Sequence, residues 1–115
     1  MRVLPFAAGA FALAAVVGAT APSPAERVIH VTAKRFEYDP PEIHVRRGEP
    51  VVLELESLDR EHGFAIPKLG VDADIVPGQP TRVRLVPTKP GRFRFACNVF
   101  CGSGHEGMAG ELVVE

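Results

Sequence analysis

A short segment near the C-terminus gathers most of the side chains that could hold a metal. Residues 97–108 carry two thiols, an imidazole and a thioether, on Cys97, Cys101, His105 and Met108. Thiolate and thioether are soft ligands that favour copper, and imidazole binds copper equally well. Structural zinc usually takes four Cys or His ligands, and iron–sulfur clusters need more cysteines than this chain has. The segment therefore predicts a copper site.

The two cysteines leave more than one arrangement open. A mononuclear blue-copper site needs one Cys and would leave the other unused, whereas two bridging thiolates would hold two copper ions close together. A disulfide between Cys97 and Cys101 is the plainest competitor, because exported domains are usually oxidised and contain even numbers of cysteines. A disulfide would leave His105 and Met108 unexplained, so we favour copper.

The rest of the chain must position these side chains, and it has the pattern of a β-domain. Short alternating runs are separated by Pro and Gly, and no apolar run has helical spacing. The runs occur at residues 28–34, 42–46, 51–56, 82–85, 92–95 and 110–115. Residues 57–80 are irregular, and we expect a strand end, a long connection and a turn there. The pattern predicts one all-β sandwich or barrel over residues 26–115.

The first 25 residues differ in composition from the rest. Residues 3–21 contain no charge, Arg2 precedes them and small residues follow, which is typical of a secretory signal peptide. An N-terminal membrane anchor is the alternative, since about 20 apolar residues can span a bilayer. In both cases residues 26–115 are expected outside the cytoplasm, in the periplasm, either free or anchored to the inner membrane.

Charge and motifs exclude several function classes. A formal net charge of −1 argues against a nucleic-acid binder, which needs a basic face for phosphates. No catalytic Ser/His/Asp arrangement or phosphate-binding glycine loop stands out. His30 and His44 lie on the polar sides of predicted strands, where solvated histidines are common. Asp59 and Glu61 are near His62 in sequence; Glu61 is expected in solvent, and Asp59 could orient the imidazole.

Two segments resemble a known family. The segment CNVFCGSGHEGM is similar to the binuclear purple-copper (CuA) motif of cytochrome c oxidase subunit II, with its Cys, Cys, His and Met at the same spacing. The segment DREHGFAIPKLGVDADIVPGQ resembles the same family's region around its first copper-binding histidine. The resemblance extends from the strand near Val28 to Glu115. It implies a cupredoxin-like Greek-key β-barrel or sandwich.

The resemblance also implies the ligands. Cys97 and Cys101 would be bridging thiolates, and Met108 a weak ligand to one copper. His62 and His105 would be the terminal imidazoles. A backbone carbonyl, that of Val99, would complete the set. Many family members have an acidic residue in place of Val99, whose side chain engages a further metal at the oxidase interface. The apolar side chain of Val99 cannot make that contact.

The function implied is one-electron transfer through a two-copper centre, with no substrate transformed in this domain. The partners would be a donor such as a cytochrome c and, if the chain is a subunit, oxidase subunit I. A free periplasmic carrier is equally compatible with the sequence. Two other functions remain open: a periplasmic chaperone or store that delivers Cu(I) to an oxidase, and a disulfide-stapled β-domain that binds a protein.

Overall fold

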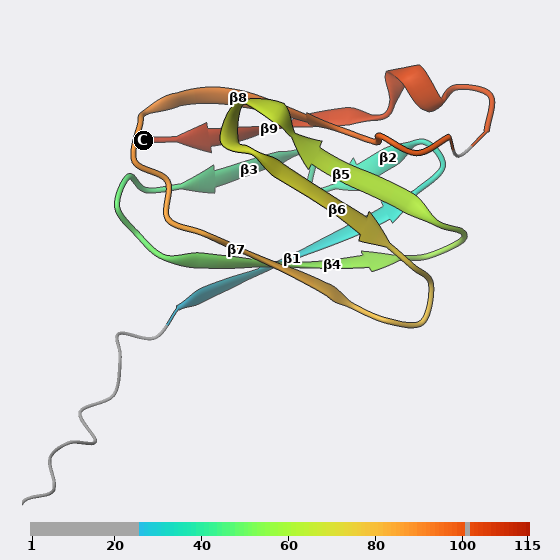
Figure 1. Ribbon diagram of the computed structural model, residues 1–115, viewed down its shortest axis with the longest axis horizontal. Coiled ribbons are helices and arrows are strands. Elements are labelled where there is room, and N and C mark those ends of the chain that lie inside the picture. Colours follow the sequence, from blue (N-terminus) through green and yellow to red (C-terminus); the bar gives the residue numbers. More distant parts are fainter. Residues whose placement is uncertain (1–25, 101) are drawn as a thin grey trace, which may run out of the picture.

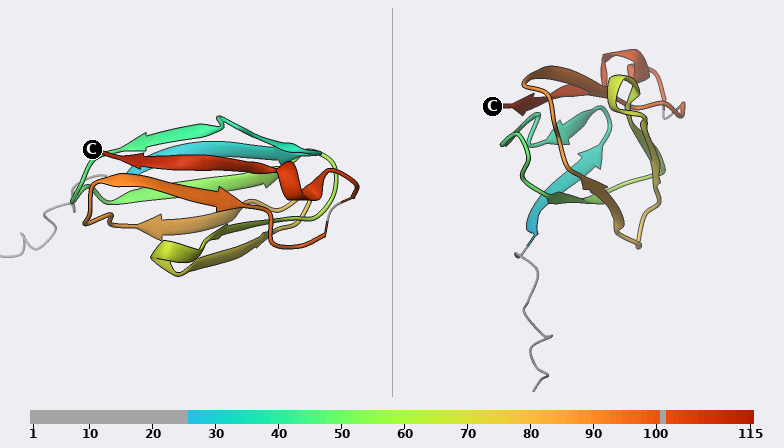
Figure 2. Two further views of the ribbon diagram at one scale, coloured as in Figure 1. Left: turned by 90° about the horizontal axis from the view of Figure 1, so that it is seen from above. Right: turned by 60° about the vertical axis from the view of Figure 1, so that its left-hand side comes forward.

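Two β-sheets pack face to face in the computed structural model, which describes residues 26–100 and 102–115 (Figures 1 and 2). The four-stranded sheet has the order β2-β1-β4-β7, with bounds β1 Arg27–Lys34, β2 Glu37–Asp39, β4 Val51–Ser57 and β7 Thr81–Leu85. The five-stranded sheet has the order β3-β9-β8-β5-β6, with bounds β3 Glu42–Val45, β5 His62–Ile66, β6 Val71–Ile75, β8 Gly91–Ala96 and β9 Ala109–Val114. Strand β1 pairs with β4, and β3 with β9, in parallel; the other pairs are antiparallel. The predicted all-β sandwich is confirmed.

The core forms because alternate residues of both sheets turn toward each other. Leu53 and Leu55 of β4 are fully buried, as are Phe64 of β5 and Phe95 of β8. The rings of Tyr38, Phe64 and Phe95 pack together, with centroids 4.8 to 5.8 Å apart. Aromatic groups bury large apolar areas, and edge-to-face pairs add to that stabilisation. This cluster lies beneath the start of β5 and the end of β8.

The prediction of a long connection was wrong for residues 62–75. Strands β5 and β6 pair along their whole length, from His62 with Ile75 to Ile66 with Val71. Strand β5 has no alternation that the sequence could reveal, because four of its five residues are buried. The two strands are joined by the 3₁₀ turn η2 (Pro67–Leu69) and by Gly70, whose φ of 70° is left-handed.

The loops that carry the predicted ligands meet at one end of the sandwich. Strand β8 ends just before Cys97, β5 begins at His62, and the 3₁₀ turn η3 (His105–Gly107) precedes β9. In Figure 1 this end lies opposite the C-terminus and the start of β1. The predicted signal peptide or anchor, residues 1–25, lies outside the described residues. No helix in the described part of the chain is long and apolar enough to span a membrane.

Candidate metal centre

His62 is a buried imidazole with one nitrogen hydrogen-bonded and the other without a partner among the described residues. It opens β5 and is 0% exposed. Its Nε2 lies 2.6 Å from Asp59 Oδ1, so the ring donates this N–H to the carboxylate. The other ring nitrogen, Nδ1, has no hydrogen-bond partner among the described residues, and a ring with its proton on Nε2 keeps a lone pair there. A metal-ligating histidine typically donates its other N–H to a carboxylate in this way.

Asp59 is held as an ionised acceptor. Its Oδ2 accepts the backbone N–H of Arg35 at 2.8 Å, and its Oδ1 accepts that of Arg60 at 2.6 Å. Burial works to raise the pKa of Asp59, but the hydrogen bonds from Arg35, His62 and Arg60 outweigh it and lower the pKa to about 2. The carboxylate is therefore charged at neutral pH and fixes the proton of His62 on Nε2.

Cys97 brings three distant parts of the chain together. Its Sγ accepts the backbone N–H of Gly63 at 3.3 Å and lies 3.1 Å from the carbonyl oxygen of Val99. Its backbone N–H donates to the carbonyl oxygen of Met108 at 3.2 Å. The side chain is buried. The sulfur is therefore fixed between the start of β5 and the segment that follows β8.

Gly63 is required for this close approach between β5 and the segment after β8. A Cβ at this position would lie 1.8 Å from Oδ1 and 2.9 Å from the backbone nitrogen of Asn98. The carbonyl oxygen of Gly63 accepts the buried hydroxyl of Tyr38 at 2.6 Å. The residue next to His62 is thus tied both to the aromatic core and to the cysteine.

His105 and Met108 are carried by η3. The backbone N–H of His105 donates to Gly102 at 3.1 Å, and that of Met108 donates to His105 at 3.0 Å. Met108 is fully buried, whereas His105 is partly exposed. The His105 ring lies 5.7 Å from that of Phe100, which is 72% exposed. One edge of the candidate centre therefore faces solvent and carries an aromatic side chain.

The structure places five of the six predicted ligands at the same end of the domain. Backbone or sulfur contacts join Cys97, Val99 and Met108 and link them to the residue after His62; His105 is joined through Met108. Cys101 lies outside the described residues. Within residues 26–100 and 102–115, no group of three or more His, Cys, Asp and Glu side chains is arranged to hold a metal. The unpaired Nδ1, the sulfur and the thioether nevertheless fit copper in their chemistry.

Of the other residues considered from the sequence, three are exposed and one contacts His62. His30 and His44 are exposed and pair with Glu54 and Glu42, so the expectation that they are solvated is confirmed. Glu61 is exposed, as expected. Asp59, which the sequence left open, contacts His62.

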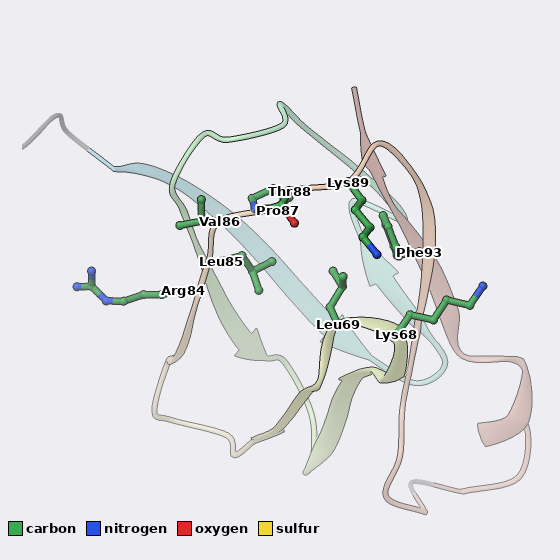
Figure 3. A pocket seen from close by; sticks show the side chains of 9 residues that line it. All are labelled: Lys68, Leu69, Arg84, Leu85, Val86, Pro87, Thr88, Lys89 and Phe93. Atoms are coloured by element: carbon green, nitrogen blue, oxygen red, sulfur yellow. The ribbon is translucent and has the colours of Figure 1, made fainter.

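A hollow of about 720 Å³ lies at a distance from these residues (Figure 3). Its lining mixes apolar and polar side chains, from Leu69, Leu85, Val86, Pro87 and Phe93 on one hand and Lys68, Arg84, Thr88 and Lys89 on the other. It contains no His, Cys or Met. The metal-ligand candidates therefore belong to the loop end and not to this hollow.

Known proteins match both the sequence and the fold. The family profile described as "Cupredoxin-like domain" matches residues 6–114. Cytochrome c oxidase subunit 2 of Thermus thermophilus is 35% identical over 92 residues, which are 80% of this chain and 68% of that protein. Nitrous-oxide reductase of Ralstonia nicotianae is 32% identical over 91 residues, 76% of this chain but 14% of that enzyme. The periplasmic domain of cytochrome oxidase subunit II (CoxB) of Bradyrhizobium japonicum shares the fold, with a TM-score of 0.73, 22% identity, and coverage of 81% of this chain and 86% of that one.

Proposed function

Because this chain belongs to the cupredoxin-like family and is homologous to cytochrome c oxidase subunit 2, we propose that it transfers electrons through a copper centre. The centre would occupy the loop end of the sandwich, between the start of β5, the end of β8 and η3. Homology supports the electron-transfer role as a whole. The residues of the loop end support the particular site.

The observation that carries the proposal is the state of His62. A fully buried ring has Nε2 donating to an ionised carboxylate while Nδ1 lacks any hydrogen-bond partner among the described residues. Leaving a buried polar atom unpaired costs about 1 to 3 kcal/mol, so such atoms call for an explanation. A metal ion that accepts the Nδ1 lone pair provides one.

We propose a ligand set that uses every soft group of the loop end. It comprises His62, Cys97, Val99 through its carbonyl oxygen, Cys101, His105 and Met108. The two thiolates would bridge two copper ions, and copper would supply a one-electron redox couple. A chain with two cysteines and one Met in this segment matches that donor set more completely than a single-copper site does.

The protein's own contribution would be to fix the ligands before any metal binds. Asp59 holds the tautomer of His62, and Tyr38 and Gly63 hold the backbone beside it. Burial of Cys97 and Met108 excludes water from the sulfur ligands. Ligands that need not move between oxidation states keep the reorganisation small, which favours rapid electron transfer.

The relatives support a carrier without its own substrate. A similar domain is found in cytochrome c oxidase subunit 2 and in a small part of nitrous-oxide reductase. Enzymes named for such different reactions share a need for electrons, so the common domain is best explained as an electron carrier. For this chain we propose a cytochrome c as donor, and oxidase subunit I or another extracytoplasmic reductase as acceptor.

The proposal is tested by loading the purified domain with copper and comparing two histidine variants. The native chain should bind two copper ions and give a reversible one-electron wave in voltammetry. His62→Gln should lose copper, whereas His30→Gln, which changes an exposed histidine, should not. Equal copper contents in the two variants would refute the site.

The same samples separate the other candidate functions. A copper chaperone or store would release Cu(I) readily to a chelator and show no reversible wave. A structural disulfide between Cys97 and Cys101 would leave the purified protein without copper and without titratable thiols.

A further inference from the structure

The turn between β1 and β2 contacts the residues that support His62 and also the loop that precedes His105. It consists of Arg35 and Phe36, which lie far in sequence from every predicted ligand. In Figures 1 and 2 this turn lies beside the loop that leads to η3. The contacts of these two residues indicate what the turn does.

Arg35 acts on the His62 side. Its backbone N–H donates to Asp59 Oδ2 at 2.8 Å, and Asp59 Oδ1 lies 2.6 Å from His62 Nε2. The main chain of the turn thus holds the carboxylate that orients the buried imidazole. Because the donor is a backbone group, its position is set by the path of the turn.

Phe36 acts on the His105 side. A Cβ at Gly104 would lie 3.0 Å from the Phe36 ring at Cδ2 and 3.1 Å at Cε2. A Cβ at Gly102 would lie 3.3 Å from the ring at Cε1 and Cζ. The backbone of this loop therefore passes so close to two different edges of the ring that only glycine fits without displacement. Both glycines have positive φ, 130° for Gly102 and 100° for Gly104.

Backbone hydrogen bonds link Gly102 and Gly104 to the candidate ligands. The carbonyl of Gly102 accepts the N–H of His105 at 3.1 Å, and the carbonyl of Gly104 accepts that of Gly107 at 3.0 Å. The next bonds run from Met108 to His105 and from Cys97 to Met108, at 3.0 and 3.2 Å. The Phe36 ring, against which Gly102 and Gly104 pack, therefore sets the position of η3, including His105 and the following Met108.

We propose that Phe36 is a positioning residue for the metal-ligand loop, and that the β1–β2 turn sets the spacing between the His62 and His105 sides. Phe36 is partly buried and packs against the hydrophobic core, so the ring is a firm support. The identity of the ligands rests on the proposed function. The support of η3 by Phe36 is independent of the proposed function, and it can be measured in the metal-free protein.

The test compares Phe36→Ala and Phe36→Leu with Phe93→Ala. Phe93 is the matched control, because it is also a partly buried phenylalanine packed against the core, but it lines the hollow away from the ligands. In the metal-free protein, Phe36→Ala should speed hydrogen exchange at the amides of His105, Gly107 and Met108. Phe93→Ala should leave exchange at these amides at the native rate relative to the rest of the domain.

In the copper-loaded protein, Phe36→Ala should release copper to a competing chelator more readily, with an affinity about 10- to 100-fold lower, the range found when supports of metal ligands are removed. Phe36→Leu keeps apolar contact and should fall between Phe36→Ala and native. The electron paramagnetic resonance spectrum should change in Phe36→Ala and not in Phe93→Ala. If Phe36→Ala does not fold, the Phe36→Leu comparison decides.

The outcomes distinguish the two proposals. If the native chain binds no copper while exchange at the three amides depends on Phe36, the proposed function fails and the positioning role stands. If the native chain binds copper and the folded Phe36 variants match Phe93→Ala in exchange and copper release, the positioning role is overturned.

Discussion

Replacing Asp59 with alanine removes the carboxylate that accepts the Nε2–H of the buried His62 ring. His62 is 0% exposed, and its Nδ1 already lacks a partner among the described residues. The metal-free variant must therefore bury a polar N–H without a hydrogen bond, whichever nitrogen carries the proton. That costs about 1 to 3 kcal/mol of the free energy of unfolding. The N–H groups of Arg35 and Arg60, also released, are near solvent and should add little.

The assay is urea unfolding of the metal-free, reduced domain, with Asp74→Ala as the control. Asp74 is an exposed aspartate on β6, so this variant removes the same charge without touching a buried group. Surface changes of this kind usually alter stability by about 0.5 kcal/mol or less. Asp59→Asn, which keeps a carbonyl oxygen, should lose less stability than Asp59→Ala. If the free energies of unfolding of Asp59→Ala and Asp74→Ala differ by less than about 0.5 kcal/mol, the range of surface changes, the buried hydrogen bond from His62 to Asp59 does not stabilise the domain as expected.

Three further changes test other contacts. Tyr38→Phe leaves the buried Gly63 carbonyl without its hydroxyl partner and should lower the free energy of unfolding in urea by about 1 to 3 kcal/mol. Gly63→Ala would place a Cβ 2.9 Å from the backbone nitrogen of Asn98, so both the melting temperature and the copper content should fall, and native values would contradict the packing. The pKa of Glu42 is lowered, chiefly by its hydrogen bond with His44, so its contribution to stability exists above the ordinary value of 4.5 and is lost as the pH falls below it. Glu42→Gln should therefore make urea stability less dependent on pH in this acid range, and an unchanged pH profile would count against the pair.

The candidate ligands in residues 97–108 could be proposed from the sequence because their spacing lies within one short segment. Cys97, Cys101, His105 and Met108 could be chosen on ligand chemistry alone, whereas His62 needed the family resemblance; that these residues bind copper stays a prediction. The alternation of apolar residues likewise predicted most strands. It failed for residues 62–75: β5 has four of its five residues buried and so does not alternate, whereas β6 alternates but lies within the irregular stretch for which a connection was expected.

Asp59, three residues before His62, could be considered from the sequence, but the other supports of the site could not be predicted, because they act between residues distant in sequence. Asp59 meets Arg35 across 24 residues, and Gly63 meets Cys97 across 34. Phe36 contacts glycines that carry no side chain to mark the contact. Local spacing encodes which groups could bind a metal, but only the packing of the two sheets determines what holds those groups in place.

We propose that two copper ions share one centre at the loop end of this domain. Electron paramagnetic resonance of the oxidised, copper-loaded native chain tests it most directly, because hyperfine splitting reports how many copper nuclei the unpaired electron meets. We expect one unpaired electron shared by two equivalent copper nuclei. A spectrum with hyperfine coupling to a single copper nucleus, in a sample with one copper per chain, would contradict it.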